Sequence, residues 1–202
     1  GSTSITGGAL NVQNASALGT STGTVTVGSG AALQLQGGVT ISRPLSLGST
    51  GVNADGGLRS ISGANTYSGP ITTTAAVGFG VDSGTLTLSG LLGGSSSFTK
   101  YGSGLLVLTG TDNITGAHTI NGGTYQIGST GVLSPGGGVV MNVNNATLDL
   151  NGRSATIGAF GNPTSSLTGG TIATASGTVS LYSTGTFTTF TTNTSANSST
   201  IS

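Results

Sequence analysis

The sequence predicts an all-β protein, and more specifically a parallel β-helix (β-solenoid), on three observations. Thr, Val, Ser, Asn and 39 glycines dominate the 202 residues, a composition that favours strands and turns over helices. Apolar and polar residues alternate in short runs that glycine interrupts. The chain also repeats itself at both short and long intervals. A β-sandwich, which also has short strands at regular spacing, is the alternative.

The alternation within each run predicts which side chains face the core, because successive residues of a strand point to opposite sides. The residues expected to point inward are Val25, Val27, Leu33, Leu35, Leu86, Leu88, Leu148 and Leu150. Those expected to point outward are Thr24, Thr26, Gln34, Gln36, Thr85, Thr87 and Asp149. Glycine between the runs marks the corners of each turn, where a positive φ is easily adopted.

A long internal repeat relates residues 4–37 to residues 119–152 at a constant offset of 115 residues. "SITGGALNV" at Ser4–Val12 matches "TINGGTYQI" at Thr119–Ile127, and "AALQLQG" at Ala31–Gly37 matches "ATLDLNG" at Ala146–Gly152. The conserved offset predicts that both copies have the same local structure.

Shorter repeats predict the turns of a solenoid. "SGTLTLSG" at 83–90 matches "SGLLVLTG" at 103–110, and "GANTYSGPIT" at 63–72 resembles "GTDNITGAHT" at 110–119. Turns of about 21 residues, stacked about 4.8 Å apart, would give a rod of nine or ten turns, about 45 Å long. We assign residues 1–183 to this solenoid, and residues 184–202, rich in Thr and Ser, to a terminal rung, an exchanged strand or a linker.

The low charge excludes several classes of partner. Only 4% of the residues are charged and the formal net charge is zero, so the chain lacks the basic field that captures nucleic acid or anionic lipid. No apolar run approaches the roughly 20 residues of a membrane-spanning helix. Cys is absent from the sequence, which fits either side of a membrane.

Few residues are available for catalysis or metal binding. The carboxylates are Asp55, Asp82, Asp112 and Asp149, no two of them close in sequence, and we expect them to form turns and to be solvated. We expect His118, the single histidine, to face solvent. We therefore assign no catalytic, cofactor-binding or metal-binding residue and expect no cofactor. We expect the dispersed Tyr and Phe residues to fill the core or cap its ends.

One stretch, "KYGSGLLVLTGTDNITGAHTINGGTYQIG" at residues 100–128, closely resembles the autotransporter-associated β-strand repeat. The residues that follow the repeat are Lys100, Gly102, Gly104, Leu106, Leu108, Gly110, Asn113, Gly116, Thr119, Ile120, Gly123, Thr124 and Ile127. A partial copy, "LRSISGANTYSGPIT", contains Gly63, Asn65, Tyr67 and Gly69, and "SITGGALNV" is a third. The sequence departs from the repeat at Ile114, near an aromatic position, and at Tyr125, where Leu is usual.

The resemblance implies a right-handed parallel β-helix from a secreted or cell-surface bacterial protein, and it carries over no catalytic residue. With no signal sequence or membrane barrel visible, we expect a part of a larger polypeptide. The first hypothesis is a structural segment of a surface fibre, adhesin or autotransporter passenger, which assembles with itself into an oligomer or filament or continues in the larger chain. One alternative is a glycan- or ice-binding module, although the Thr pairs are too scattered in the sequence for an ice-binding face. The other is a polysaccharide lyase or hydrolase, which would need converging carboxylates.

Overall fold

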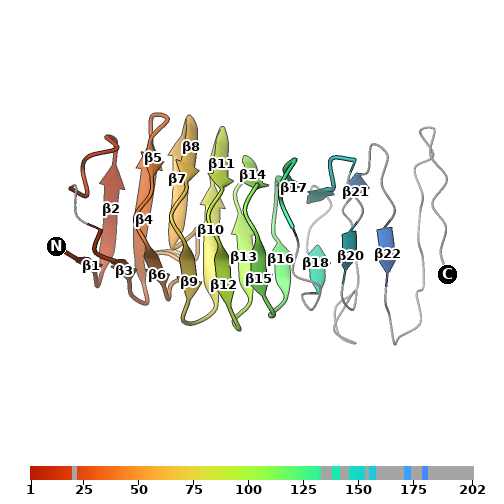
Figure 1. Cartoon of the computed structure of the whole chain (residues 1–202), viewed down its shortest axis with the longest axis horizontal. Coiled ribbons are helices and arrows are strands. Elements are labelled where there is room, and N and C mark those ends of the chain that lie inside the picture. The colour runs from red at the N-terminus through yellow and green to blue at the C-terminus, as the bar shows by residue number, and fades with distance from the viewer. Residues whose placement is uncertain are drawn as a thin grey trace.

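A computed structural model of the chain describes residues 1–19, 22–132, 138–141 and 146–152, and the backbone of three further short strands. The fold is an all-strand, parallel β-solenoid, as predicted (Figure 1). It has about six turns, whereas nine or ten were expected for all 202 residues. No helix occurs in the described residues, so none of them forms a helical membrane span. The predicted terminal segment 184–202 lies outside the described residues.

Three parallel sheets form the walls of the solenoid, and we call them sheets A, B and C. Sheet A contains β1 (Thr3–Ile5), β3 (Val25–Val27), β6 (Leu45–Leu47), β9 (Ile71–Thr73), β12 (Leu92–Gly94) and β15 (Asp112–Ile114). Sheet B contains β2 (Gly8–Val12), β4 (Ala31–Gln36), β7 (Leu58–Ser62), β10 (Val77–Val81), β13 (Phe98–Tyr101), β16 (His118–Ile120) and β18 (Val139–Met141). Sheet C contains β5 (Thr40–Ile41), β8 (Ala64–Tyr67), β11 (Thr85–Leu88), β14 (Leu105–Leu108), β17 (Thr124–Ile127), β19 (Thr147–Asp149) and β21 (Thr171–Ala173). The strands β20 (Ala155–Ile157) and β22 (Val179–Leu181) pair with each other.

From β3 to β17 the chain visits the sheets in the order A, B, C, and each strand pairs with its counterpart one turn later. The register places Thr85 opposite Leu105 and Leu86 opposite Leu106, so the short repeat at an offset of 20 residues is one turn. Turn length varies from 19 residues, between Leu105 and Thr124, to 26, between Leu45 and Ile71. Most of the variation comes from the corners and loops, and one residue is added within a strand pair, where the register of β4 and β7 shifts between Leu35 and Gln36.

The core lies where the alternation places it. Every residue predicted to point inward is buried: Val25, Val27, Leu33, Leu35, Leu86, Leu88, Leu148 and Leu150. Every residue predicted to point outward is exposed or half-buried. Phe79, Phe98, Tyr67 and Tyr125 also fill the interior, which confirms the core role for these aromatic residues. Phe79 and Phe98 pack edge to face with ring centroids 5.3 Å apart.

The two copies of the long repeat lie on different walls. Residues 4–12 span sheets A and B, whereas residues 119–127 span sheets B and C. In the same way Ala31–Gln36 is on sheet B and Thr147–Asp149 is on sheet C. The shorter repeat at an offset of 47 residues also joins different walls, because Ala64–Tyr67 is on sheet C and Asp112–Ile114 is on sheet A. These offsets therefore preserve the strand pattern without being whole numbers of turns.

The corner between sheets B and C is a column of stacked glycines. Gly84 has φ of 72°, and a Cβ there would lie 2.3 Å from the carbonyl oxygen of Gly63 in the preceding turn. A Cβ on Gly104 would lie 3.0 Å from the oxygen of Gly84, and one on Gly123 would lie 2.6 Å from the oxygen of Gly104. The high glycine content thus allows successive corners to approach as closely as the strands do.

The described residues 13–19 and 22–24 lie at the N-terminal end of the core. The loop to which they belong connects β2 directly to β3, and Leu18 packs against the core cluster. Arg43, only 6% exposed, reaches it from the next turn and donates hydrogen bonds to the carbonyl oxygens of Gly23 at 2.8 Å, Gly1 at 2.7 Å and Leu18. A hollow of about 370 Å³ beside this loop is lined by Leu18, Ile41 and Arg43 among others. Arg43 therefore fastens a cap over the apolar interior.

Candidate functional surfaces and buried polar groups

Two of the four carboxylates converge on one arginine on the outside of sheet B. Arg59 on β7 donates hydrogen bonds to Asp82, with Nε–Oδ1 at 3.0 Å and Nη2–Oδ2 at 2.8 Å, and its Nη1 contacts Asp55. Asp82 raises the pKa of Arg59. The side chains are 22–34% exposed, and the arginine holds both carboxylates. This arrangement is a surface ion cluster. Both carboxylates are paired with Arg59, so neither is available as a catalytic acid or base.

Asp149 also has a structural role, on the outside of sheet C. Its Oδ2 accepts a hydrogen bond from Gln126 Nε2 at 2.7 Å, one turn away, and its Oδ1 accepts one from the Asn151 amide at 2.8 Å. The second contact is the Asp-stabilised turn that the sequence predicted. The described residues contain no group of three or more His, Cys, Asp or Glu that could hold a metal ion.

Asp112 and His118 are buried, which contradicts the expectation that both would meet solvent. Each is 1% exposed, and Asp112 Oδ2 lies 3.2 Å from His118 Nε2. His118 faces inward because it shares a side of β16 with Ile120, whereas Thr119 between them faces out. The sequence alone could have placed His118 correctly. His118 and Ile120 are two residues apart on one strand, so both must face the same side. Asp112 Oδ1 still forms the predicted kind of turn, accepting the Ile114 amide at 2.8 Å.

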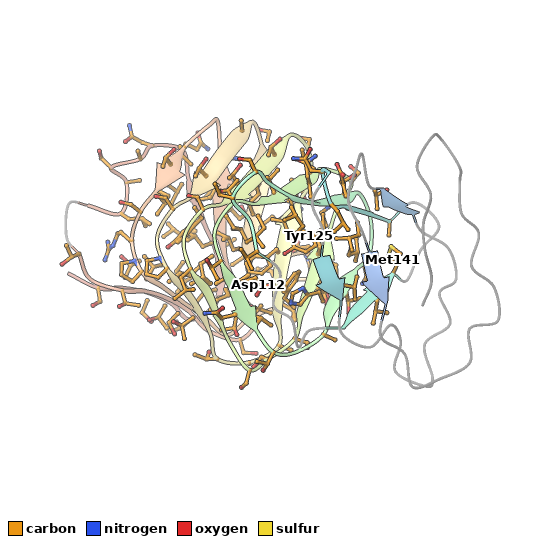
Figure 2. The ribbon with its side chains drawn as sticks, turned by 45° about the vertical axis from the view of Figure 1, so that its right-hand side comes forward. Asp112, Tyr125 and Met141 are labelled. Atoms are coloured by element: carbon orange, nitrogen blue, oxygen red, sulfur yellow. The ribbon has the colours of Figure 1, made fainter. Side chains whose placement is uncertain are left out.

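The surroundings of this pair are mainly aromatic and apolar. The His118 ring stacks on Phe98 with centroids 4.2 Å apart, and Tyr125 lies 6.3 Å from it, while Val139 is its partner in the next turn. Figure 2 shows Asp112 and Tyr125 inside the solenoid, with Met141 in the following turn. Burial lowers the pKa of His118 to about 4. Burial, and then the charge of Asp112, raises the pKa of Tyr125.

This buried group is a poor candidate for a catalytic site. Asp112, His118 and Tyr125 are each at most 1% exposed, so a substrate would have to separate stacked turns to reach them. Neither ring nitrogen of His118 has a hydrogen-bond partner among the described residues, because the approach to Asp112 has the distance but not the direction of a hydrogen bond. The residues are therefore candidates for controlling stability rather than for chemistry.

Lys100, the first residue of the repeat-like stretch, is also buried, a placement that the sequence analysis did not anticipate. Its inward position on β13 lies between Phe79 and Ile120 of the adjacent turns. Its Nζ donates hydrogen bonds to the corner carbonyl oxygens of Tyr101 at 3.2 Å and Gly102 at 2.6 Å. Burial lowers the pKa of Lys100 to about 8. The ammonium thus binds the chain at the corner where β13 gives way to β14.

The burial of Lys100 predicts a rise in stability in mildly alkaline solution. The unfolded chain keeps the proton up to a pKa near 10.5, whereas the folded chain releases it near 8, so the unfolded state binds more protons between these values. We expect the free energy of unfolding to rise by about 1–2 kcal/mol from pH 8 to about 9.5. Urea titrations at each pH would measure it. The Lys100→Met variant should lose the rise, and a rise of equal size in that variant would contradict this assignment.

The three outer walls differ in shape and charge. Sheet A presents one narrow column of outward residues, which are Ser4, Thr26, Ser46, Thr72, Gly93 and Asn113. Sheet B carries the ion cluster and is partly covered by the loop 50–56. Added Cβ atoms on Gly78 and Gly80 would lie 2.7 Å from the Thr50 carbonyl oxygen and 2.0 Å from that of Asp55. Sheet B is therefore not flat.

The strands of sheet C lie along the upper edge of the view in Figure 1. Their outward side chains form two columns. The first column is Ala64, Thr85, Leu105, Thr124 and Thr147, and the second is Thr40, Thr66, Thr87, Val107, Gln126 and Asp149. The threonines are more ordered than the sequence suggested, because three successive turns align Thr40, Thr66 and Thr87. Leu105 and Val107 interrupt the threonines in the middle turn.

Part of the chain is similar in sequence to a known protein. The chain is 33% identical over 125 residues to a protein named "Adhesin BmaC autotransporter" from Brucella suis biovar 1 (strain 1330), an alignment covering 60% of this chain. The alignment covers only 4% of that relative's length. No family model matches the chain. No solved structure matches it either. The chain is thus a β-solenoid with a distant, partial similarity to an autotransporter adhesin.

Proposed function

We propose that this chain is a non-catalytic structural segment of the passenger of a bacterial surface adhesin, exported by an autotransporter route. The observation that carries the proposal is the solenoid fold of a chain whose sequence is 33% identical over 125 residues to part of an autotransporter adhesin. A continuous parallel stack makes a long, stiff body out of short turns, which suits a segment that holds other parts of a protein away from a cell.

The placement of the polar groups supports a structural role. Asp55 and Asp82 are held by Arg59, and Asp149 by Gln126, while Asp112 and His118 are enclosed in the core. Enzymes that cleave polysaccharides on comparable scaffolds need carboxylates that reach the substrate. The convergence of Asp55 and Asp82 does not meet this need, because both carboxylates contact the same guanidinium group.

Antibodies raised against the purified chain would test the location, with intact and permeabilised cells of the producing bacterium compared. We expect labelling of intact cells that is removed when the cells are treated with an external protease. Labelling that requires permeabilisation would overturn the proposed location. Incubation of the chain with neutral and acidic polysaccharides should release no new reducing ends, and their release would overturn the non-catalytic role.

A further inference from the structure

The outer wall of sheet C presents two columns of side chains and is free of charge over most of its length. From Thr40 to Gln126 its two outward columns contain Ala, Thr, Leu, Val and Gln, and the first charged side chain is Asp149, at the last described turn. The described outward residues of sheet A form a single column, and sheet B carries Arg59 and the covering loop. Sheet C is therefore the wall best suited to bind an extended, uncharged partner.

We propose that the outer wall of sheet C binds a neutral, extended polysaccharide, with the threonine hydroxyls of successive turns meeting successive sugars. The inference goes beyond the proposed surface function and does not depend on the export route. Its basis is the arrangement of Thr66, Thr85, Thr87 and Thr124 around Leu105 and Val107 on neighbouring strands.

The chemistry of the wall fits sugars. A hydroxyl both donates and accepts hydrogen bonds, so a threonine can pair with a sugar hydroxyl in either sense. The methyl groups of threonine, together with Leu105 and Val107, provide apolar contacts for the C–H faces of the rings. The absence of charge between Thr40 and Gln126 gives no reason to select an anionic polymer, and favours a neutral one.

The spacing and the area of the wall favour a repetitive partner. Outward residues on adjacent turns are about 4.8 Å apart. This distance is similar to the length that one sugar unit adds to an extended β-1,4-linked chain. The six strands of sheet C from β5 to β19 contain 21 residues, which at about 3.3 Å per residue and about 4.8 Å between strands give a footprint of roughly 330 Å². A stable protein interface buries about 800 Å² on each partner, so the wall is too small for a firm dimer of this chain. A polymer can compensate for weak single contacts, because it engages many turns at once.

Co-sedimentation of the purified chain with microcrystalline cellulose and with chitin, both neutral β-1,4-linked polymers, would test the proposal. The Thr85→Val/Thr87→Val variant removes two hydroxyls and keeps the branched shape that strands favour. The matched control, Thr26→Val/Thr72→Val, removes two hydroxyls from sheet A. We expect the sheet C variant to bind roughly tenfold more weakly, and the sheet A variant to bind like the parent chain.

Three results would overturn the proposal. The first is that the parent chain binds neither polymer. The second is that both double variants lose binding equally, which would remove the assignment to sheet C. The third is self-association, seen by light scattering, that the sheet C variant abolishes while polymer binding stays absent, since the wall would then bind a second copy. None of these results bears on labelling of intact cells, so the proposed surface location is tested separately.

Discussion

Replacing Gly84 with alanine is expected to lower the free energy of unfolding by about 3 kcal/mol or more. Two causes add. Gly84 has φ of 72°, a conformation that costs an L-residue about 1–2 kcal/mol. A Cβ would also lie 2.3 Å from the carbonyl oxygen of Gly63, which accepts the hydrogen bond from the Thr85 amide at 3.0 Å. Relief of the clash must move this acceptor, so one hydrogen bond between turns is weakened as well.

Gly30→Ala is the matched control for Gly84→Ala. Gly30 also has φ of 72°, but nothing lies within 4 Å of the position that a Cβ would take. We expect this variant to lose only about 1 kcal/mol. Urea unfolding of both variants and the parent chain would measure the difference. Equal losses of stability in the two variants would show that the positive φ alone accounts for the cost. That result would contradict the inference that close stacking of the corners requires glycine at position 84.

The strands and the core could be predicted because they depend on local alternation. Leu33 and Leu35 are buried and Gln34 between them is not, and the same holds for Leu86, Thr87 and Leu88. An uninterrupted alternation fixes the facing of a strand whatever its partner is. The same rule would have placed His118 inside. The expectation that an isolated histidine faces solvent is wrong for His118, which is 1% exposed.

The contacts between turns could not be predicted, because they depend on the length of every corner and loop. Arg59 meets Asp82 across 23 residues and Asn65 accepts the Val39 amide across 26. A single assumed period cannot give both distances, since the turns range from 19 to 26 residues. For the same reason the 115-residue repeat gave no indication that its two copies lie on different walls.

Acidification is expected to destabilise the folded chain through His118. The folded pKa is about 4, below the ordinary value of 6.5, because burial disfavours the imidazolium. Between these values the unfolded state binds more protons than the folded state, so the free energy of unfolding falls as the pH falls. The full loss from pH 6.5 to pH 4 is at most about 3 kcal/mol. It should be seen as a decreasing urea midpoint.

The composition makes this measurement unusually clean. The chain has one histidine, no Glu and no Cys, so His118 is the side chain of the unfolded state whose reference pKa lies nearest this window, between pH 5 and 6.5. We expect the His118→Gln variant to be insensitive to pH in this window. A variant that keeps the full slope would contradict the assignment to His118.

The direction in which stability changes on acidification shows whether burial or the charge of Asp112 controls the pKa of His118. The groups around His118 are Asp112 on β15, Phe98 on β13, Tyr125 on β17 and Val139 on β18. If an ionised Asp112 governed the pair, it would hold the imidazolium in the folded state, and stability would rise on acidification. If burial controls the pKa of His118 instead, stability falls on acidification. The Asp112→Asn variant removes the charge and should keep the fall, because enclosure between stacked turns remains its cause.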